Sequence, residues 1–121
     1  METREIANKL VHHCREGKNV DFINEFYGDN IISKEPKGSH RELTEGKEAV
    51  KNKTIEWYSS VQEVHDVEIS EPIVAGNFFS CGMHMDVTYK EYGRMAMDEI
   101  CVFEVKDGKI IAEEFFYNIP G

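Results

Sequence analysis

Two glutamates and one cysteine lie close together in the last quarter of the chain. Glu99 and Cys101 belong to an apolar run that begins at Met97, and Glu113 belongs to a second run that ends at Tyr117. If these runs form a hairpin, the two carboxylates lie diagonally across neighbouring strands on an apolar, aromatic face. In such surroundings it is unfavourable for both carboxylates to ionise, so the pKa of one of them rises. The pair then consists of a protonated acid beside an ionised base.

Two other interpretations of this pair of carboxylates stay open. They could form a cation-binding site, or they could be structural glutamates that accept hydrogen bonds from Tyr27, Trp57, Tyr58 or a histidine. Buried carboxylates are rare without a reason, and that reason is often a hydrogen bond that the fold needs.

Glu35 is a third candidate, at the end of the short apolar run 31–35 and just before Pro36. Proline cannot donate to a strand ladder, so the predicted strand ends there. A carboxylate at a strand end that points into an apolar cavity is desolvated, which raises its pKa and makes it a usable base near neutral pH. The alternative is a solvated glutamate in a polar loop beside Lys34 and Lys37.

The remaining residues with coordinating or nucleophilic side chains do not form a metal-binding pattern. The histidines are His12, His13, His40, His65 and His84, and the cysteines are Cys14, Cys81 and Cys101. The cysteines form no C-x-x-C pair and each lies in an apolar pattern, so we expect buried, reduced thiols. The sequence also has no glycine-rich phosphate loop, and we expect neither a metal nor a cofactor.

A predicted hairpin positions the C-terminal carboxylates. Its turn lies at residues 106–108, where Gly108 can adopt a positive φ. A three-residue turn with a G1 bulge places Cys101 opposite Glu113. One face then carries Met97, Glu99, Cys101, Phe103, Glu113, Phe115 and Tyr117, and the other carries Ile100, Val102, Ile110, Ala112 and Phe116. Both faces are too apolar for water, so one should line a core or pocket and the other should meet a partner.

The elements before this hairpin are expected in the order helices first, strands later. Apolar residues at helical spacing predict helices over residues 3–15, from residue 19 to Gly28, and over residues 47–60, with Thr3 as the first N-cap. From Val61 the period changes to two, which predicts strands over residues 61–70 and 78–90. The core face of the second strand carries Phe79, Cys81, Met83, Met85, Val87 and Tyr89. This order predicts an α+β fold with a curved antiparallel sheet around N-terminal helices.

Length and charge limit the possible partners. The chain has 121 residues and a net charge of −9, with no apolar run near the ~18 residues that a membrane helix needs. We therefore expect a single domain over residues 1–121 in a soluble, cytoplasmic protein. The negative charge argues against binding to nucleic acid or to an anionic membrane, and it favours an uncharged or cationic small ligand.

In this order, the elements resemble the nuclear-transport-factor-2-like superfamily, and within it the SnoaL-like proteins and ketosteroid isomerases. The segments that carry the resemblance are FINEFYGDNIISKEP, EGKEAV and EVKDGKIIAEEFFY, at residues 22–36, 45–50 and 104–117. The resemblance implies a cone-shaped domain whose concave sheet and helices enclose a pocket, commonly in a homodimer formed through the convex sheet face. It also places the face that carries Glu99 and Glu113 inward.

The resemblance also suggests roles for individual residues. Ketosteroid isomerases keep a proton-shuttling carboxylate where Glu35 stands, but their oxyanion donors correspond to Val11 and Cys101, which cannot donate a strong hydrogen bond to an enolate. Steroid isomerisation is therefore not expected. SnoaL-like cyclases rely on an acidic pocket residue, a role that Glu99 or Glu113 could serve. The catalytic candidates are thus Glu35, Glu99 and Glu113, and the expected ligand contacts are Val11, Tyr27, Trp57, Met83, Met85, Cys101, Phe103, Phe115 and Tyr117.

Three functions follow as hypotheses. The first is a SnoaL-like pocket protein that binds a small, largely apolar organic molecule, as an acid/base enzyme of isomerase, cyclase or hydratase type that needs no cofactor. The second is a non-catalytic ligand-binding or dimerisation module of the same fold. The third, a protein-transport adaptor, has only the fold in its favour, and a fold does not imply a function.

Overall fold

The computed structural model describes residues 1–119, and it confirms the α+β class. The helices are α1 (Thr3–Arg15), α2 (Asn19–Phe26) and α3 (Lys47–Ser60). The strands are β1 (Tyr27–Lys34), β2 (Leu43–Glu45), β3 (Val61–Ile69), β4 (Ile73–Ala75), β5 (Phe78–Tyr89), β6 (Gly93–Lys106) and β7 (Lys109–Phe116). They form one sheet in the order β2-β1-β7-β6-β5-β3, and β4 pairs with β5. The pairing of β1 with β7 is parallel, and the other pairings are antiparallel.

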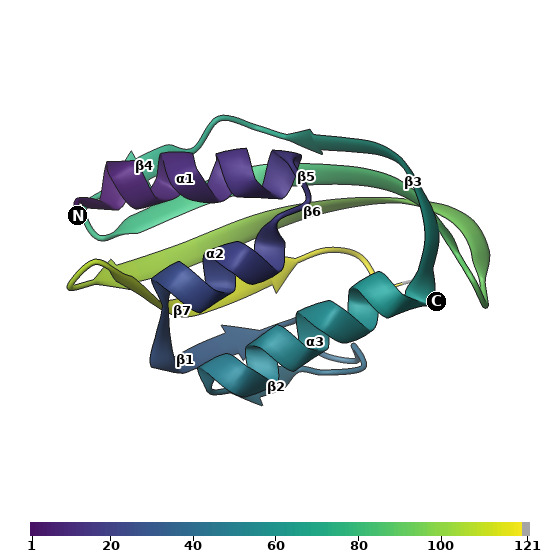
Figure 1. Cartoon of the computed structure of the whole chain (residues 1–121), viewed down its shortest axis with the longest axis horizontal. Coiled ribbons are helices and arrows are strands. Elements are labelled where there is room, and N and C mark those ends of the chain that lie inside the picture. Colours follow the sequence, from purple (N-terminus) through teal and green to yellow (C-terminus); the bar gives the residue numbers. More distant parts are fainter. Residues whose placement is uncertain (120–121) are drawn as a thin grey trace.

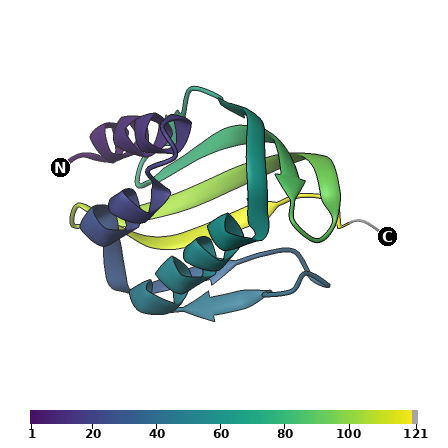
Figure 2. The ribbon, with the colours of Figure 1, turned by 45° about the vertical axis from the view of Figure 1, so that its right-hand side comes forward.

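The sheet curves strongly around the helices. Figure 1 shows all three helices on the concave side, with α3 next to β1 and β2, and Figure 2 shows the long strands β5 and β6 arching behind them. This arrangement confirms the predicted curved sheet wrapped around helices. It leaves a space between the sheet and the helices that the side chains fill only in part.

Helix α1 has the predicted bounds, and its apolar face forms part of the core. Ile6, Ala7, Leu10 and Val11 are all buried at the spacing of one helix face. The N-cap is Glu2 rather than the predicted Thr3. Glu2 and Glu5 form a reciprocal capping box, in which the Glu5 carboxylate accepts a hydrogen bond from the backbone N–H of Glu2.

The predicted second helix is too long at its C-terminal end. Helix α2 ends at Phe26, and Tyr27 already has extended backbone angles as the first residue of β1. Tyr27 pairs with Ile110 of β7, so the sheet outweighs the local helical pattern. Strand β1 therefore begins four residues earlier than the predicted strand at residues 31–35.

Two short strands were missed by the sequence pattern. Strand β2 begins at the last residue of the polar loop that the sequence predicts over residues 37–43, and it pairs with the end of β1. Strand β4 lies between the two strands predicted over residues 61–70 and 78–90, and it pairs with the start of β5. Segments of three residues are too short to show a period of two, so pairing with a neighbour defines them.

Strand β5 has the predicted inward face. Phe79, Cys81 and Val87 are buried, while Met83, Met85 and Tyr89 are half-buried and alternate with residues on the outer face. The half-buried members lie where the sheet leaves the core. There they face the space next to α3.

The C-terminal hairpin has a different turn from the predicted one. Asp107 and Gly108 both have positive φ, at 51° and 76°, and Lys106 pairs directly with Lys109. This is a two-residue turn of the primed type, which matches the twist of the strands. A register shift between Glu104 and Val105 then accommodates one extra residue in β7.

The new register changes which residues meet but not which face most of them share. Phe103, rather than Cys101, lies opposite Glu113, and Cys101 lies opposite Phe115. Because the error in register is two residues, the predicted inward set stays on one face. Ile110 is the exception: it is fully buried opposite Val105, not on the outer face. The bulge between the turn and Glu113 reverses the alternation there.

Within residues 1–119, none of the helices is long and apolar enough to cross a bilayer.

Candidate functional site

A cavity of about 760 Å³ lies between the concave sheet face and the helices. We call it the helix–sheet cavity. Its inner end is formed by buried apolar side chains, among them Leu10, Phe22 and Phe103. At the other end it reaches the surface, because Val64 on its rim is 45% exposed. A cavity of this size is within the range that binds drug-sized molecules.

Most of the predicted site residues line this cavity. They are Glu35, Glu99 and Glu113 among the catalytic candidates, and Tyr27, Trp57, Met83, Met85, Phe103, Phe115 and Tyr117 among the ligand contacts. Val11 and Cys101 are not among the lining residues. Both are almost fully buried in the hydrophobic core, so the positions that correspond to the isomerase oxyanion donors are covered by other side chains.

Glu113 is held at the inner end of the cavity by two hydroxyl groups. Its carboxylate accepts a hydrogen bond from the Tyr27 hydroxyl at Oε1 and one of 2.7 Å from the Ser33 hydroxyl at Oε2. The residue is only 4% exposed. Burial raises the pKa of Glu113, while the two hydroxyl donors and the Lys53 ammonium oppose that rise.

Lys53 connects the Ser33 hydroxyl to the carboxylate of Glu35. Its ammonium donates to the Ser33 hydroxyl at 3.0 Å and to Glu35 Oε2 at 3.0 Å. The other carboxylate oxygen of Glu35 accepts a bond of 2.6 Å from the Tyr117 hydroxyl. A continuous chain of hydrogen bonds therefore runs from Glu113 through Ser33 and Lys53 to Glu35.

The Glu35 side chain lines the cavity and is largely shielded from the solvent. It follows the last residue of β1, where the sequence analysis placed a strand end, and it contacts Lys53 of α3 rather than its neighbours Lys34 and Lys37. Both side chains of the ion pair are less than one-fifth exposed. A charge pair shielded to this extent is more than a surface salt bridge.

Glu99 lies on the same wall in different surroundings. Its carboxylate accepts one hydrogen bond, from the Cys101 thiol at 3.6 Å, and no other residue within the described range 1–119 donates to it. Burial is the largest cause that raises the pKa of Glu99, to about 7; the thiol and Lys53 lower it, and Glu35 and Glu113 raise it further. Near neutral pH this group can therefore give or accept a proton.

The two glutamates of the hairpin are farther apart than the sequence predicts. Glu113 lies opposite Phe103, four residues along β6 from Glu99, so they are not diagonal neighbours. Four residues of a strand span about 13 Å. Each carboxylate therefore has its own surroundings, and the two interact over a distance instead of sharing a proton.

An aromatic group forms the wall next to Glu99. The Trp57 indole N–H donates to the Tyr89 hydroxyl at 3.1 Å, and that hydroxyl lies 3.4 Å from the Met97 sulfur. Met97 is two residues from Glu99 on the inward face of β6. Tyr58 packs edge-on against Trp57 with ring centroids 5.1 Å apart. These residues make the outer half of the cavity aromatic and rich in sulfur.

Sequence reasoning missed Ser33, Lys53 and Tyr89 as site residues. A signal existed for Lys53, which lies in helical phase with Ala49, Val50 and Trp57 on the third helix. A lysine on a face that is otherwise apolar needs a buried acceptor, here Glu35. Ser33 could have been found from strand alternation, because it shares a face with Ile31, which is also fully buried.

The exposed outer face of the sheet carries an acidic group with a histidine. Ligand atoms of Asp66, Glu68 and His84 all lie within 4.8 Å of one another. Asp98 also accepts a hydrogen bond of 2.7 Å at the His84 ring. Exposed acidic clusters of this kind are common without an ion, and we assign no metal site. The cysteines Cys14, Cys81 and Cys101 are free thiols.

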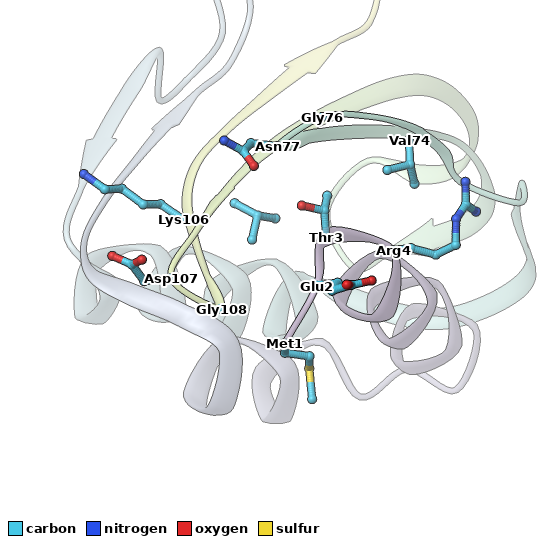
Figure 3. A pocket seen from close by; sticks show the side chains of 11 residues that line it. Met1, Glu2, Thr3, Arg4, Val74, Gly76, Asn77, Lys106, Asp107 and Gly108 are labelled. Carbon is cyan, nitrogen blue, oxygen red and sulfur yellow. The ribbon is translucent and has the colours of Figure 1, made fainter.

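A second hollow, of about 610 Å³, lies at the start of α1 (Figure 3). Its walls are the first four residues, the β4–β5 turn at Gly76 and Asn77, and the hairpin turn at residues 106–108. These are mostly exposed turn residues, and the hollow contains none of the buried carboxylates. The helix–sheet cavity is therefore the candidate site.

Comparisons with known proteins agree with this architecture. Residues 1–117 match the SnoaL-like domain family. A Mesorhizobium loti protein assigned as a SnoaL-like polyketide cyclase, and also labelled a carbohydrate phosphatase, is 34% identical; the alignment covers 97% of this chain and 100% of that protein, with a TM-score of 0.88. A search of curated proteins found no match.

Two more distant solved structures share the fold. A Bacillus subtilis protein assigned as an isomerase is 21% identical, with a TM-score of 0.73 and coverage of 98% of this chain and 90% of that one. A Catenulispora acidiphila protein with a ketosteroid isomerase-like fold, in complex with trimethylamine, is 14% identical, with a TM-score of 0.75 and coverage of 95% and 86%. At these identities the likeness concerns the fold alone.

Proposed function

The chain belongs to the SnoaL-like family, and we propose that its helix–sheet cavity binds a small, largely apolar organic molecule and exchanges a proton with it. The observation that carries this proposal is that Glu35, Glu99 and Glu113 line one cavity whose other walls are mainly apolar. Carboxylates are rarely placed on such a wall without a purpose, because burial disfavours their charged form.

Glu99 is the proposed group that exchanges the proton. Its pKa of about 7 leaves both protonation states populated near neutral pH, which is the condition for efficient acid/base catalysis. Its single hydrogen bond comes from a thiol, a weak donor, so a ligand does not have to displace a strong partner. Glu99 therefore can contact a ligand directly.

Glu35 and Glu113 take a supporting role in this proposal. Each accepts hydrogen bonds at both carboxylate oxygens, from Lys53 and Tyr117 in one case and from Tyr27 and Ser33 in the other. Donors that hold both oxygens fix the orientation of a carboxylate. These two residues therefore present carboxylates of fixed orientation around the ligand.

Proton exchange at an apolar ligand is a step common to isomerases, cyclases and hydratases. The M. loti relative is assigned as a polyketide cyclase, which agrees with this type of chemistry. The core positions of Val11 and Cys101 argue against steroid isomerisation, because an enolate in the cavity would lack the donors of that reaction. We therefore propose acid/base chemistry without strong oxyanion stabilisation.

Exchange of α-protons tests this function. 4-Phenylcyclohexanone is apolar and of a size that suits a cavity of about 760 Å³. A base can remove its α-protons, and in D2O each departing proton is replaced by a deuteron that NMR detects. The exchange passes through an enolate, for which the cavity supplies general-base catalysis by Glu99 but no strong oxyanion donor. We therefore expect an acceleration of about 100-fold from general-base catalysis alone, which Glu99→Gln loses. Glu114→Gln, which makes the same charge change at an exposed position, should keep it.

The same experiment separates the enzyme from a non-catalytic binding module. Binding of the ketone without faster exchange would support the module and contradict catalysis. That alternative is favoured by the core positions of Val11 and Cys101. If calorimetry detects no binding of the ketone or of any apolar molecule of similar size, the proposed function is wrong.

A further inference from the structure

The carboxylate of Glu99 faces the cavity with little of its hydrogen-bonding capacity used. An ionised carboxylate can accept about four hydrogen bonds, and within residues 1–119 only the Cys101 thiol donates to Glu99. Glu35 and Glu113, on the same cavity, each have strong donors at both oxygens. Glu99 is thus the carboxylate in this cavity that a ligand can supply with a donor.

The neighbouring wall cannot supply that donor. The Trp57 N–H is used by the Tyr89 hydroxyl, and the Tyr89 hydroxyl points to the Met97 sulfur. With their donors engaged with one another, these residues present aromatic rings and a polarisable sulfur to the cavity. Aromatic faces and thioethers attract cations and apolar groups.

The charges that line the cavity also favour a cation. Four carboxylates, those of Glu35, Asp98, Glu99 and Glu113, line the cavity together with two cations, Lys53 and Arg15. Both cations are already bonded, Lys53 to Glu35 and Ser33 and Arg15 to the Ile69 carbonyl and Glu71. The whole chain has a net charge of −9, which attracts cations and repels anions over a longer range. An anionic ligand would bring a further negative charge beside carboxylates that are already hard to ionise.

We propose that the ligand carries an amine in its cationic form, which docks between the Glu99 carboxylate and the aromatic wall formed by Trp57 and Tyr89. This inference rests on the proposed function, because it specifies the polar group of the molecule that the cavity binds. The apolar body of the ligand then lies toward the inner end, against Phe22 and Phe103.

Docking of a cation also moves a proton. When Glu99 is protonated, the ammonium displaces that proton: the carboxyl O–H bond breaks and the proton leaves to the buffer, while the ion pair forms. The titratable groups that interact with Glu99 from the surrounding elements are Lys53, Glu35, Glu113, Cys14, Cys81, Cys101, Tyr89 and Tyr117. Lys53 and Glu35 are paired to each other, and Glu113 is bonded to the Tyr27 and Ser33 hydroxyls. The released proton is therefore assigned to Glu99, and the Glu99→Gln variant tests this assignment.

Three probes with the same ring and chain length test the inference. 4-Phenylbutylamine, 4-phenylbutanol and 4-phenylbutanoate each carry a phenyl ring on a four-carbon chain, and their polar ends are a cation, a neutral donor and an anion. Calorimetry at pH 6.5 should give an affinity for the amine at least tenfold above that for the alcohol, with the butanoate weaker still. Repeating the amine titration in buffers of different ionisation enthalpy should reveal release of more than half a proton per bound ligand.

Two variants identify the residue responsible. Glu99→Gln should bind the amine and the alcohol within about threefold of each other and release no proton. Glu114→Gln, an exposed glutamate on β7 that does not line the cavity, should keep the preference of the wild type. Thermal unfolding of each variant checks that it is folded. The wild-type comparison of the three probes remains decisive even if the Glu99 variant does not fold.

Other outcomes contradict the inference in distinguishable ways. Equal binding of the amine and the alcohol, preference for the butanoate, or unchanged amine preference in Glu99→Gln would overturn the inference and leave the proposed apolar site intact. If none of the three probes binds, both the inference and the proposed function are overturned.

Discussion

Glu99 and Glu113 are two glutamates on the inward face of one sheet, and their surroundings give them different properties. Glu113 is nearly inaccessible, yet the Tyr27 and Ser33 hydroxyls compensate for the lost contact with water. Glu99 has only a thiol as donor. A buried carboxylate without strong donors destabilises the folded state when it ionises. The sequence alone treats these residues as a pair. Their different hydrogen-bond donors are the basis on which we propose a supporting role for Glu113 and proton exchange for Glu99.

The pH dependence of the free energy of unfolding measures how much ionised Glu99 destabilises the folded protein. The ordinary pKa of a glutamate side chain is 4.5, whereas that of Glu99 in the folded protein is about 7, so the folded state binds a proton more tightly than the unfolded state between these values. Stability is therefore lost as pH rises from 4.5 through 7, by at most ~3 kcal/mol. We expect Glu99→Gln to remove this loss, so that it matches the wild type at pH 4.5 and exceeds its free energy of unfolding at pH 8.

Urea unfolding at several pH values provides that measurement. The contribution of Glu113 is present in both proteins and cancels in the difference. A difference between variant and wild type that does not change with pH would contradict the account of Glu99.

Tyr27→Phe tests whether the hydroxyl donors stabilise Glu113. The change removes the donor to a buried carboxylate and leaves the ring in place, so we expect a loss of about 2 kcal/mol in the free energy of unfolding at pH 8. Tyr92→Phe is the matched control, because Tyr92 is 74% exposed and should change stability by less than about 0.5 kcal/mol. Equal effects of the two substitutions would show that the Tyr27 hydroxyl contributes nothing.

At the scale of elements, the C-terminal hairpin explains why part of the site could be predicted. Alternation along β6 and β7 placed Glu99, Phe103, Glu113 and Phe115 on one face without knowledge of the turn. An error of two residues in register preserves the faces and changes only the partners. The distance between Glu99 and Glu113 depends on the partners, and it was therefore predicted incorrectly.

The turn itself can be tested by a pair of glycine substitutions. Gly108 has a φ of 76°, where an L-residue is strained, so Gly108→Ala should lower the free energy of unfolding by about 1–2 kcal/mol. Gly82 of β5 lacks a positive φ, and an added Cβ would meet Ser70 Oγ at 3.7 Å, an ordinary contact. Gly82→Ala should therefore leave stability unchanged or raise it by up to about 1 kcal/mol. Thermal or urea unfolding decides, and a harmless Gly108→Ala would contradict the primed turn.

Contacts between elements explain what could not be predicted. Lys53 was visible in the helical pattern, but its partner Glu35 is 18 residues away on another element, and only the packing of α3 beside β1 brings them together. Ser33 and Tyr27 reach Glu113 across about 80 residues. Local pattern carries no information on such long-range partners. The identity of a site residue can thus be predicted more easily than its role.

At the scale of the whole molecule, the curvature that encloses the cavity also leaves an apolar outer face. Ile100, Phe78 and Phe116 are exposed there, and Ile100 lies opposite Phe116. We propose that a second copy of the chain covers this face to form a homodimer, as expected from the resemblance. An apolar patch of this kind is unfavourable in water unless a partner buries it.

Measurement of molar mass tests the dimer. Ile100→Glu should convert a dimer into a monomer in analytical ultracentrifugation, because it places a charge in the contact. Leu43→Glu on β2 is the control: Leu43 is 55% exposed against 58% for Ile100, so the change is matched in type and exposure. A wild type that sediments as a monomer at micromolar concentration would contradict the proposal.

The measurement that tests the central claim most directly is carboxyl NMR of the protein labelled with ¹³C at the glutamate side chains. On addition of 4-phenylbutylamine, the resonances of Glu35, Glu99 and Glu113 should shift together, with Glu99 moving most, while Glu114 on the outer face stays in place. Glu2, which lines the second hollow, should also stay in place. Shifts confined to Glu2, or none at the three cavity glutamates when the ligand is bound, would contradict the helix–sheet cavity as the functional site.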